Sequence, residues 1–117
     1  MLFICYPNCS TCKKAKKFLE EGKFEFKERD IKLERPSVDE ITEWIRTSGV
    51  SVKKFFNTSG LAYKNLGLKD KLNGMSEEEQ IKLLAADGML VKRPILIGNG
   101  LILVGFKLEE WMEKLKK

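Results

Sequence analysis

The pattern of hydrophobic and polar residues divides the chain into three stretches, and the first of them covers residues 1–31. Residues 2–6 form a continuous apolar run of strand length, which predicts a strand covered on both faces. A helical pattern follows Ser10 and ends near Gly22, because glycine is a natural residue at a helix C-terminus. Over residues 24–31, apolar and charged positions alternate as in a half-buried strand. Residues 1–31 therefore predict a βαβ arrangement.

The middle of the chain, residues 32–92, has a helical pattern instead. Two capping boxes mark helix starts, because in each a serine precedes a glutamate by three residues and an apolar periodic stretch follows. They pair Ser37 with Glu40 and Ser76 with Glu79. Between them, glycines separate segments of mixed apolar and basic residues, in which we expect short helices. This region is therefore predicted to be a helical insertion.

The last stretch, residues 93–117, returns to strand patterns before a final helix. Two apolar runs flank the Gly-Asn-Gly sequence at residues 98–100, which accepts positive φ at low cost and predicts a β-hairpin. The helix that follows has apolar residues at helical spacing, namely Leu108, Trp111, Met112 and Leu115. The chain is therefore expected to end as ββα.

Together these stretches predict an α/β fold. The order β-α-β, helical insertion, β-β-α is accommodated by a mixed four-stranded sheet with helices on both faces. With 117 residues and 43% hydrophobic content, the chain is long enough for one core and too short for two. We therefore predict a single domain over residues 1–117.

Charge and cysteine content narrow the function classes. The net charge of +5 favours anionic ligands or acidic partners, but the basic residues are too dispersed to indicate nucleic-acid binding. The four lysines within residues 13–17 are interpreted either as a solvated helix face or as charge that lowers the pKa of a nearby thiol. No apolar run approaches the length of a membrane span, and three cysteines are an odd number for a secreted disulfide framework. We therefore expect a cytoplasmic protein.

Cys9 and Cys12 lie where the first strand is predicted to lead into the first helix. The first N–H groups of a helix have no intrahelical partner, so a thiol placed there is shifted toward the reactive thiolate. The second thiol, three residues later, is within reach around the first turn and can close a disulfide. Cys5, inside the strand pattern, is expected to be an inert core residue. The pair therefore predicts redox chemistry.

Two other interpretations of the cysteine pair are weaker. Half of a zinc site needs further ligands, but the chain has no histidine and its one other cysteine lies in a strand pattern. A purely structural disulfide would stabilise little, because closing so short a loop removes little chain entropy.

Several features together resemble one known family. A Cys-x-x-Cys sequence after the first strand of a βαβ and ββα chain looks like the thioredoxin fold of the glutaredoxin type. The helical insertion, the segment 51–67 and the Lys-Arg-Pro-Ile-Leu-Ile sequence at residues 92–97 resemble the arsenate reductase (ArsC) family, which also contains the Spx-type redox regulators. The resemblance covers essentially the whole chain. It implies a four-stranded mixed sheet with the helical insertion between the second and third strands.

The resemblance also implies a set of site residues. Cys9 matches the cysteine that attacks arsenate, and Arg93 matches an arginine that binds and polarises the oxyanion. Pro94 matches the cis-proline of thioredoxin folds, which faces the active cysteine. Around Cys9, the residues expected to contact substrate are Asn8, Ser10 and Thr11.

At three positions the chain departs from the glutaredoxin-linked reductases. Lys53 occupies the place of a second family arginine, and Gly105 occupies that of a third, in the second strand of the hairpin. A lysine is a point charge and lacks the bidentate fork of arginine, so it is not an equivalent ligand for an oxyanion. The alternative for Lys53 is ordinary surface charge, and that for Arg93 is a solvated strand edge. Cys12, which those reductases usually lack, is a disulfide switch in Spx-like proteins.

Two functions follow from the resemblance. The first is a thiol-dependent, arsenate reductase-like enzyme in which Cys9 attacks an oxyanion or a disulfide. Cys12 or an external thiol, such as glutathione with glutaredoxin or thioredoxin, would then resolve the product without a metal or organic cofactor. The second is an Spx-like redox regulator that binds the C-terminal domain of the RNA polymerase α subunit and does not contact nucleic acid directly. Against the second, residues 46–51 look shorter than the segment that docks on polymerase in those regulators.

Overall fold

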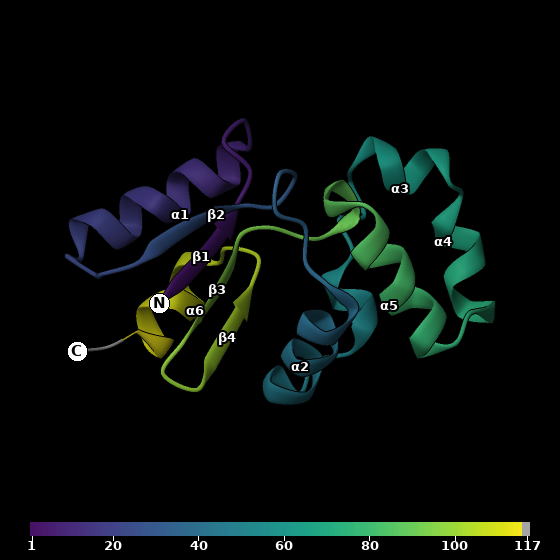
Figure 1. The fold of residues 1–117 in the computed structure, drawn as a ribbon. Helices are drawn as coiled ribbons and strands as arrows, with labels where there is room; N and C mark the ends of the chain where they lie inside the picture. The colour runs from purple at the N-terminus through teal and green to yellow at the C-terminus, as the bar shows by residue number, and fades with distance from the viewer. Residues whose placement is uncertain (116–117) are drawn as a thin grey trace. The chain divides into compact units, whose positions relative to one another are not determined.

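A computed structural model of the chain describes residues 1–115. The chain divides into two compact units, which we describe separately. Unit 1 comprises Met1–Asp30 and Arg93–Lys117, and unit 2 comprises Ile31–Lys92. In Figure 1 the strands, the first helix and the last helix belong to unit 1, and the helices between them belong to unit 2. The single-domain organisation inferred from the sequence stays a prediction.

No helix among the described residues is both long enough and apolar enough to span a membrane.

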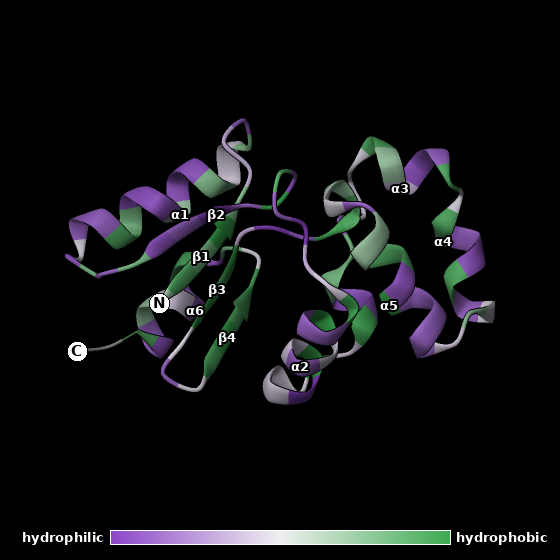
Figure 2. Cartoon of the chain, in the orientation of Figure 1, coloured by the Kyte–Doolittle hydropathy of each residue, from purple (hydrophilic) through white to green (hydrophobic). Residues whose placement is uncertain are grey.

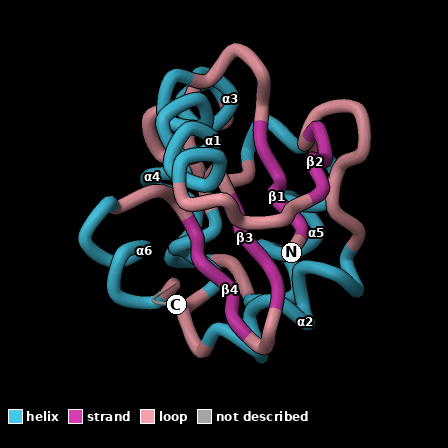
Figure 3. The backbone as a smooth tube through the Cα atoms, turned by 90° about the vertical axis from the view of Figure 1, so that its left-hand side faces the viewer, coloured by secondary structure: helices cyan, strands magenta, loops and turns pink. Residues whose placement is uncertain are grey.

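The sheet of unit 1 has four strands, as the sequence predicted. They are β1 (Leu2–Cys5), β2 (Lys27–Asp30), β3 (Ile95–Gly98) and β4 (Leu101–Val104), in the order β2-β1-β3-β4. β1 runs parallel to β2 and antiparallel to β3, and β3 runs antiparallel to β4, so the sheet is mixed. The four strands lie side by side in Figure 3. The two halves of unit 1, distant in sequence, are therefore joined by the pairing of β1 with β3.

Strand β2 is shorter and more polar than the pattern indicated. The predicted strand began at Phe24, but the strand formed is Lys-Glu-Arg-Asp, an edge strand whose hydrophilic character is visible in Figure 2. Phe24 and Phe26 precede it and pack against the core of unit 1, where Phe26 contacts Phe3 edge-to-face at a centroid distance of 5.6 Å. The alternation of apolar and charged residues therefore reflects two phenylalanines that pack against the core just before the strand begins.

Helices α1 (Ser10–Glu21) and α6 (Leu108–Lys114) pack on the same face of the sheet. Trp111 of α6 is fully buried, contacts Phe18 of α1 edge-to-face, and donates its indole N–H to the Gly105 carbonyl oxygen at 3.1 Å. Both helices of unit 1 therefore cover one face of the sheet, and the expectation of helices on both faces stays a prediction.

The predicted apolar stripe of α6 is only partly buried. Leu108 and Met112 are 52% and 56% exposed, whereas Trp111 is fully buried and Leu115 packs against the core. A large indole ring therefore supplies the main contact of this short helix.

The end of α1 differs from the prediction in its mechanism. Gly22 is the C-terminal cap, but its backbone is right-handed (φ −79°), and the left-handed residue is Lys23 with φ 58°. Glycine is required at position 22 for space, because a Cβ there would lie 2.6 Å from the Phe24 ring. The hairpin matches its prediction, since Asn99 and Gly100 have φ of 53° and 75°.

Unit 2 is helical. Its elements are α2 (Val38–Ser48), η1 (Val52–Phe55), α3 (Leu61–Asn65), α4 (Leu68–Lys71), η2 (Leu72–Gly74), α5 (Glu77–Ala86) and η3 (Gly88–Leu90). Both predicted capping boxes are formed: the N–H of Glu40 donates to the Ser37 hydroxyl and that of Glu79 to the Ser76 hydroxyl, each at 3.1 Å. Each serine N–H donates in return to the glutamate carboxylate. Helix α2 packs against α5.

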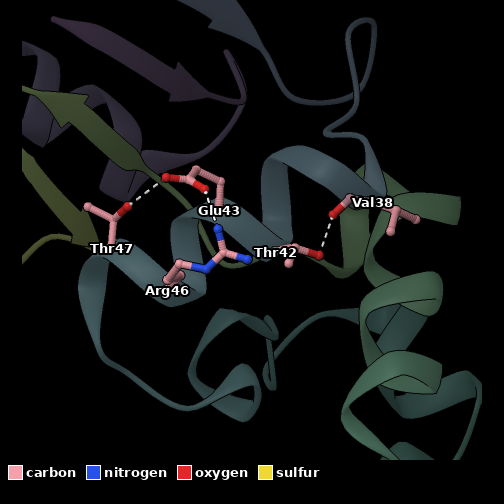
Figure 4. A network of polar contacts seen from close by, with 5 residues as sticks. All are labelled: Val38, Thr42, Glu43, Arg46 and Thr47. Carbon is pink, nitrogen blue, oxygen red and sulfur yellow. Dashed lines mark hydrogen bonds and ion pairs between the residues drawn. The ribbon is translucent and has the colours of Figure 1, made fainter.

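The surface of α2 carries local polar contacts, drawn in Figure 4. Arg46 forms an ion pair with Glu43 at 3.1 Å, and the Thr47 hydroxyl donates to the other oxygen of the same carboxylate at 3.3 Å. The Thr42 hydroxyl donates to the Val38 carbonyl oxygen at 2.8 Å. Because these groups are exposed, the contacts orient side chains more than they stabilise the fold.

Candidate active site

The turn between β1 and α1 places Cys9 at the start of the helix. Cys9 is the N-cap residue of α1, with extended backbone angles. Its N–H donates to the Tyr6 carbonyl oxygen at 2.9 Å, and its carbonyl oxygen accepts from the N–H of Lys13 at 3.1 Å. No side chain caps the first turn with a regular hydrogen bond. The first helical N–H groups therefore lack a capping side chain and can stabilise negative charge on the Cys9 sulfur.

The environment of Cys9 favours its thiolate. Partial burial by itself would raise the pKa of the Cys9 thiol, but other interactions outweigh it and the pKa is lowered from its ordinary value. These are, in decreasing order, the N–H of Cys12, the thiol of Cys12, the N–H of Thr11 and the positive charge of Arg93. All of them stabilise the charged sulfur, as expected at a helix N-terminus.

Cys12, in the first turn of α1, has the opposite character. Its side chain is buried in the core of unit 1, and its sulfur accepts a hydrogen bond from the N–H of Tyr6 at 3.4 Å. Burial raises the pKa of the Cys12 thiol to about 12, and the proximity of Cys9 contributes to the rise. Cys12 is therefore a neutral thiol beside a sulfur that prefers to be charged.

Cys5 lies on β1 in the same core. Burial, followed by the carboxylates of Glu28 and Asp30, raises its pKa to about 11. All three cysteines are free thiols in this structure.

Arg93 and Pro94 lead into β3. The peptide bond between them is cis, which confirms the prediction for Pro94. The Arg93 guanidinium lies over the Tyr6 ring, with 5.3 Å between its carbon and the ring centroid, and its charge lowers the pKa of Cys9. The structure therefore brings Arg93 into the surroundings of Cys9, and its role in binding an anion stays a prediction.

The remaining predicted site residues differ in placement. Thr11 is half-buried and directs its N–H toward Cys9, while Asn8 and Ser10 are exposed beside it. Lys53 belongs to η1 of unit 2, where its ammonium donates to the side-chain carbonyl of Asn73. Its role toward Cys9 stays a prediction.

Gly105 follows the end of β4 instead of lying within it. Its φ of 77° is in the left-handed region, where a side chain would be strained, and its N–H donates to the Pro94 carbonyl oxygen at 2.7 Å. The absence of an arginine here is therefore consistent with the backbone conformation of this chain.

The lysines at residues 13–17 do not dominate the site. Lys16 pairs with Glu28 at 2.6 Å and Lys17 with Glu21 at 3.8 Å, and none of the leading contributions to the Cys9 pKa comes from a lysine. The solvated-face interpretation therefore accounts for this cluster better.

Sequence reasoning missed Tyr6. The Tyr6 carbonyl oxygen accepts a hydrogen bond from the Cys9 N–H, and the Tyr6 N–H donates one to the Cys12 sulfur. The Tyr6 ring contacts Arg93. The available signal was an aromatic residue placed directly between the first strand and the Pro-Asn-Cys turn. Among residues 1–115, no group of three or more histidine, cysteine or carboxylate side chains could hold a metal ion.

Comparisons with known proteins identify similar sequences and structures. A structure of a protein from Bacteroides fragilis described as ArsC family related is 57% identical, covers 98% of this chain and 96% of its own, and superposes with a TM-score of 0.94. A possible arsenate reductase from Streptococcus mutans UA159 is 46% identical, with 93% and 94% covered and a TM-score of 0.85. The global transcriptional regulator Spx of Listeria innocua is 30% identical over 89% of this chain and 78% of its own length. The family model of the ArsC family matches residues 5–114, and the chain belongs to this family.

Proposed function

We propose that this protein is a thiol-dependent, arsenate reductase-like oxidoreductase with Cys9 as its nucleophile. The observation that carries the proposal is the lowered pKa of Cys9 at the helix N-terminus, next to a second thiol and an arginine. The similarity to a possible arsenate reductase supports the same chemistry. Thiolate is the nucleophilic form of cysteine, so a lowered pKa increases the reactive fraction near neutral pH.

The proposed reaction proceeds in two steps. The Cys9 thiolate attacks arsenate, an S–As bond forms, and one arsenate oxygen leaves as water after protonation. A second thiolate then attacks the Cys9 sulfur, the S–As bond breaks, and its electron pair stays on arsenic, which leaves as arsenite. The two electrons gained by arsenic come from two thiols, which end as a disulfide. An external thiol reduces this disulfide and restores the enzyme.

Cys12 is the internal candidate for the second thiol. It must lose its proton to attack, and its pKa of about 12 opposes this while Cys9 is negatively charged. Formation of the S–As bond removes that charge and with it one cause of the raised pKa. Glutathione, with glutaredoxin or thioredoxin, is the external alternative.

A coupled assay with arsenate, glutathione and glutaredoxin tests the reaction by following NADPH consumption through glutathione reductase. We expect turnover in the wild type, complete loss in Cys9→Ser, and retention in Cys5→Ala. Cys12→Ser separates the two routes, because an external thiol sustains turnover without Cys12. Absence of arsenate-dependent turnover in the wild type with both glutaredoxin and thioredoxin would contradict the reductase proposal.

Mild oxidation followed by peptide mapping tests the thiol pairing. Because the Cys12 thiol interacts directly with the Cys9 sulfur, we expect a Cys9–Cys12 disulfide as the main product. A product dominated by Cys5–Cys9, or by intermolecular disulfides, would contradict this arrangement.

A redox regulator of the Spx type is the second candidate. The 30% identity to Spx and the contact between Cys9 and Cys12 favour it. In this reading the disulfide state of the pair would control binding to the C-terminal domain of the RNA polymerase α subunit.

A pull-down with the polymerase α subunit, performed on reduced and oxidised protein, distinguishes the candidates. Redox-dependent binding without arsenate turnover would favour the regulator, and turnover without binding would favour the enzyme. Arg46→Ala on α2 provides a surface variant for the same experiment, since the Arg46 side chain is exposed and contributes little to the fold.

A further inference from the structure

Tyr6 contacts each of the three groups on which the candidate site depends. Its carbonyl oxygen accepts the Cys9 N–H at 2.9 Å, and its own N–H donates to the Cys12 sulfur at 3.4 Å. Its ring lies under the Arg93 guanidinium. The first two contacts are made by the backbone and persist with any side chain at position 6. The ring contact is specific to the side chain.

The ring contact has a definite electrostatic effect on Arg93. The face of an aromatic ring is negative, and a guanidinium carbon 5.3 Å from the centroid lies within the range of a cation–π interaction. An arginine side chain has many rotamers, most of which would carry its charge away from Cys9. A half-buried ring beneath the guanidinium reduces that freedom.

We propose that Tyr6 is a positioning residue whose ring holds the Arg93 guanidinium beside the Cys9 sulfur. Tyr6 acts through Arg93 and does not itself contact the reacting atoms. The use of this arrangement in catalysis rests on the proposed function, but the arrangement itself does not, so the two can be tested separately. The ionisable groups that bear on the Cys9 sulfur are Arg93 and Cys12, with Cys5 interacting with it from β1.

The experiment measures the rate of Cys9 alkylation by iodoacetamide against pH, with mass spectrometry of the Cys9 peptide and no substrate present. In Tyr6→Leu we expect the midpoint to move to higher pH and the rate at neutral pH to fall about two- to fivefold, the range expected for loss of one cation–π contact. Tyr6→Phe keeps the ring and should restore the wild-type profile. Phe26→Leu is a matched control, because it removes an aromatic ring from the same unit near the opposite end of β1, where Leu2 pairs with Lys27.

A double-mutant cycle with Arg93→Met distinguishes positioning from simple packing. If Tyr6 acts through Arg93, then Tyr6→Leu has no further effect on the Cys9 midpoint once Arg93 is absent. An equal shift in both backgrounds, or a wild-type profile in Tyr6→Leu, would overturn the proposal. Thermal unfolding of each variant shows whether the fold is intact. A failed arsenate assay with a positive cycle would reject the proposed function alone.

Discussion

Cys9 and Cys12 lie at the two ends of the first turn of α1, and their thiols favour opposite protonation states. At the N-cap, Cys9 is half-buried, faces helix N–H groups and Arg93, and has a lowered pKa. Three residues later, Cys12 is 3% exposed, lies in the core, and has a pKa raised to about 12. The same helix therefore holds one sulfur whose surroundings favour the thiolate and one whose surroundings favour the protonated thiol.

This difference arises from the helix geometry and not from the cysteines themselves. The N-cap lies outside the helix, in front of its unpaired N–H groups, whereas a residue in the first turn can be directed into the sheet. Stabilisation of the thiolate charge therefore dominates at Cys9, and desolvation of the thiol dominates at Cys12. The predictions below test whether this contrast holds in solution.

The largest expected effect is on alkylation of the reduced protein. Because a pKa of about 12 leaves very little Cys12 thiolate near neutral pH, Cys9 should react faster with iodoacetamide by on the order of a thousandfold. Cys5, with a pKa of about 11, should also be slow. Timed quenching with peptide mass spectrometry gives the three rates. Equal rates at Cys9 and Cys12 would remove the basis for a distinct nucleophile.

The second prediction concerns stability at alkaline pH under reducing conditions. A thiol whose pKa is raised on folding contributes stability that is fully present below the unfolded pKa and is lost as pH rises through the folded pKa. For Cys12 this window runs from the unfolded value to about 12, with a loss of about 1.4 kcal/mol per pH unit. Cys9, whose pKa is lowered, contributes a slope of the opposite sign near the unfolded thiol pKa, and Cys12→Ala and Cys5→Ala both retain Cys9.

Urea unfolding between pH 8.5 and 11 measures this slope. Cys12→Ala removes one thiol, so its free energy of unfolding should fall less steeply with pH than that of the wild type, even if it is lower throughout. Cys5→Ala should flatten the slope in the same way up to pH 11. Lysine titration affects all variants equally. Parallel slopes would contradict the buried, neutral state of Cys12.

The third prediction tests the charged side of the contrast. Replacing Arg93 with Ala should weaken protection of Cys9 against alkylation by arsenate, phosphate or sulfate, because one charge-assisted contact to an anion is lost. The expected loss is on the order of 1.5–3 kcal/mol, roughly ten- to hundredfold in apparent affinity. The alkylation rate is measured against oxyanion concentration. Failure of any oxyanion to protect the wild type would favour the regulator over the reductase.

The smallest expected effect is that of Lys53→Ala in the same protection assay. Lysine offers a point charge in place of a bidentate fork, and the Lys53 ammonium already donates to Asn73. We expect a loss of protection smaller than for Arg93→Ala. A larger loss would reverse the order of importance of the two cations.

Much of this organisation could be predicted from the sequence. The hairpin and both capping boxes were correctly placed, because a few residues with local hydrogen bonds or positive φ determine them. Cys9 was identified for the same reason, since its position at a strand-to-helix junction is a local property.

Features that depend on tertiary packing could not be predicted in this way. The pattern at residues 24–31 did not reveal that Phe24 and Phe26 pack ahead of the strand, nor did the spacing in α6 reveal that Leu108 and Met112 are exposed. The contact between Tyr6 and Arg93 joins residues far apart in sequence, and no periodicity encodes it.

The pairing of β1 with β3 across the whole helical insertion also determines when the site is assembled during synthesis. The chain emerges from its N-terminus, so Cys9 and α1 are made long before Arg93 and β3. Until the hairpin has been synthesised and has paired with β1, the nascent chain carries all three cysteines without the sheet that buries two of them. The discrimination between Cys9 and Cys12 is therefore acquired only after the hairpin has been made and has paired with β1.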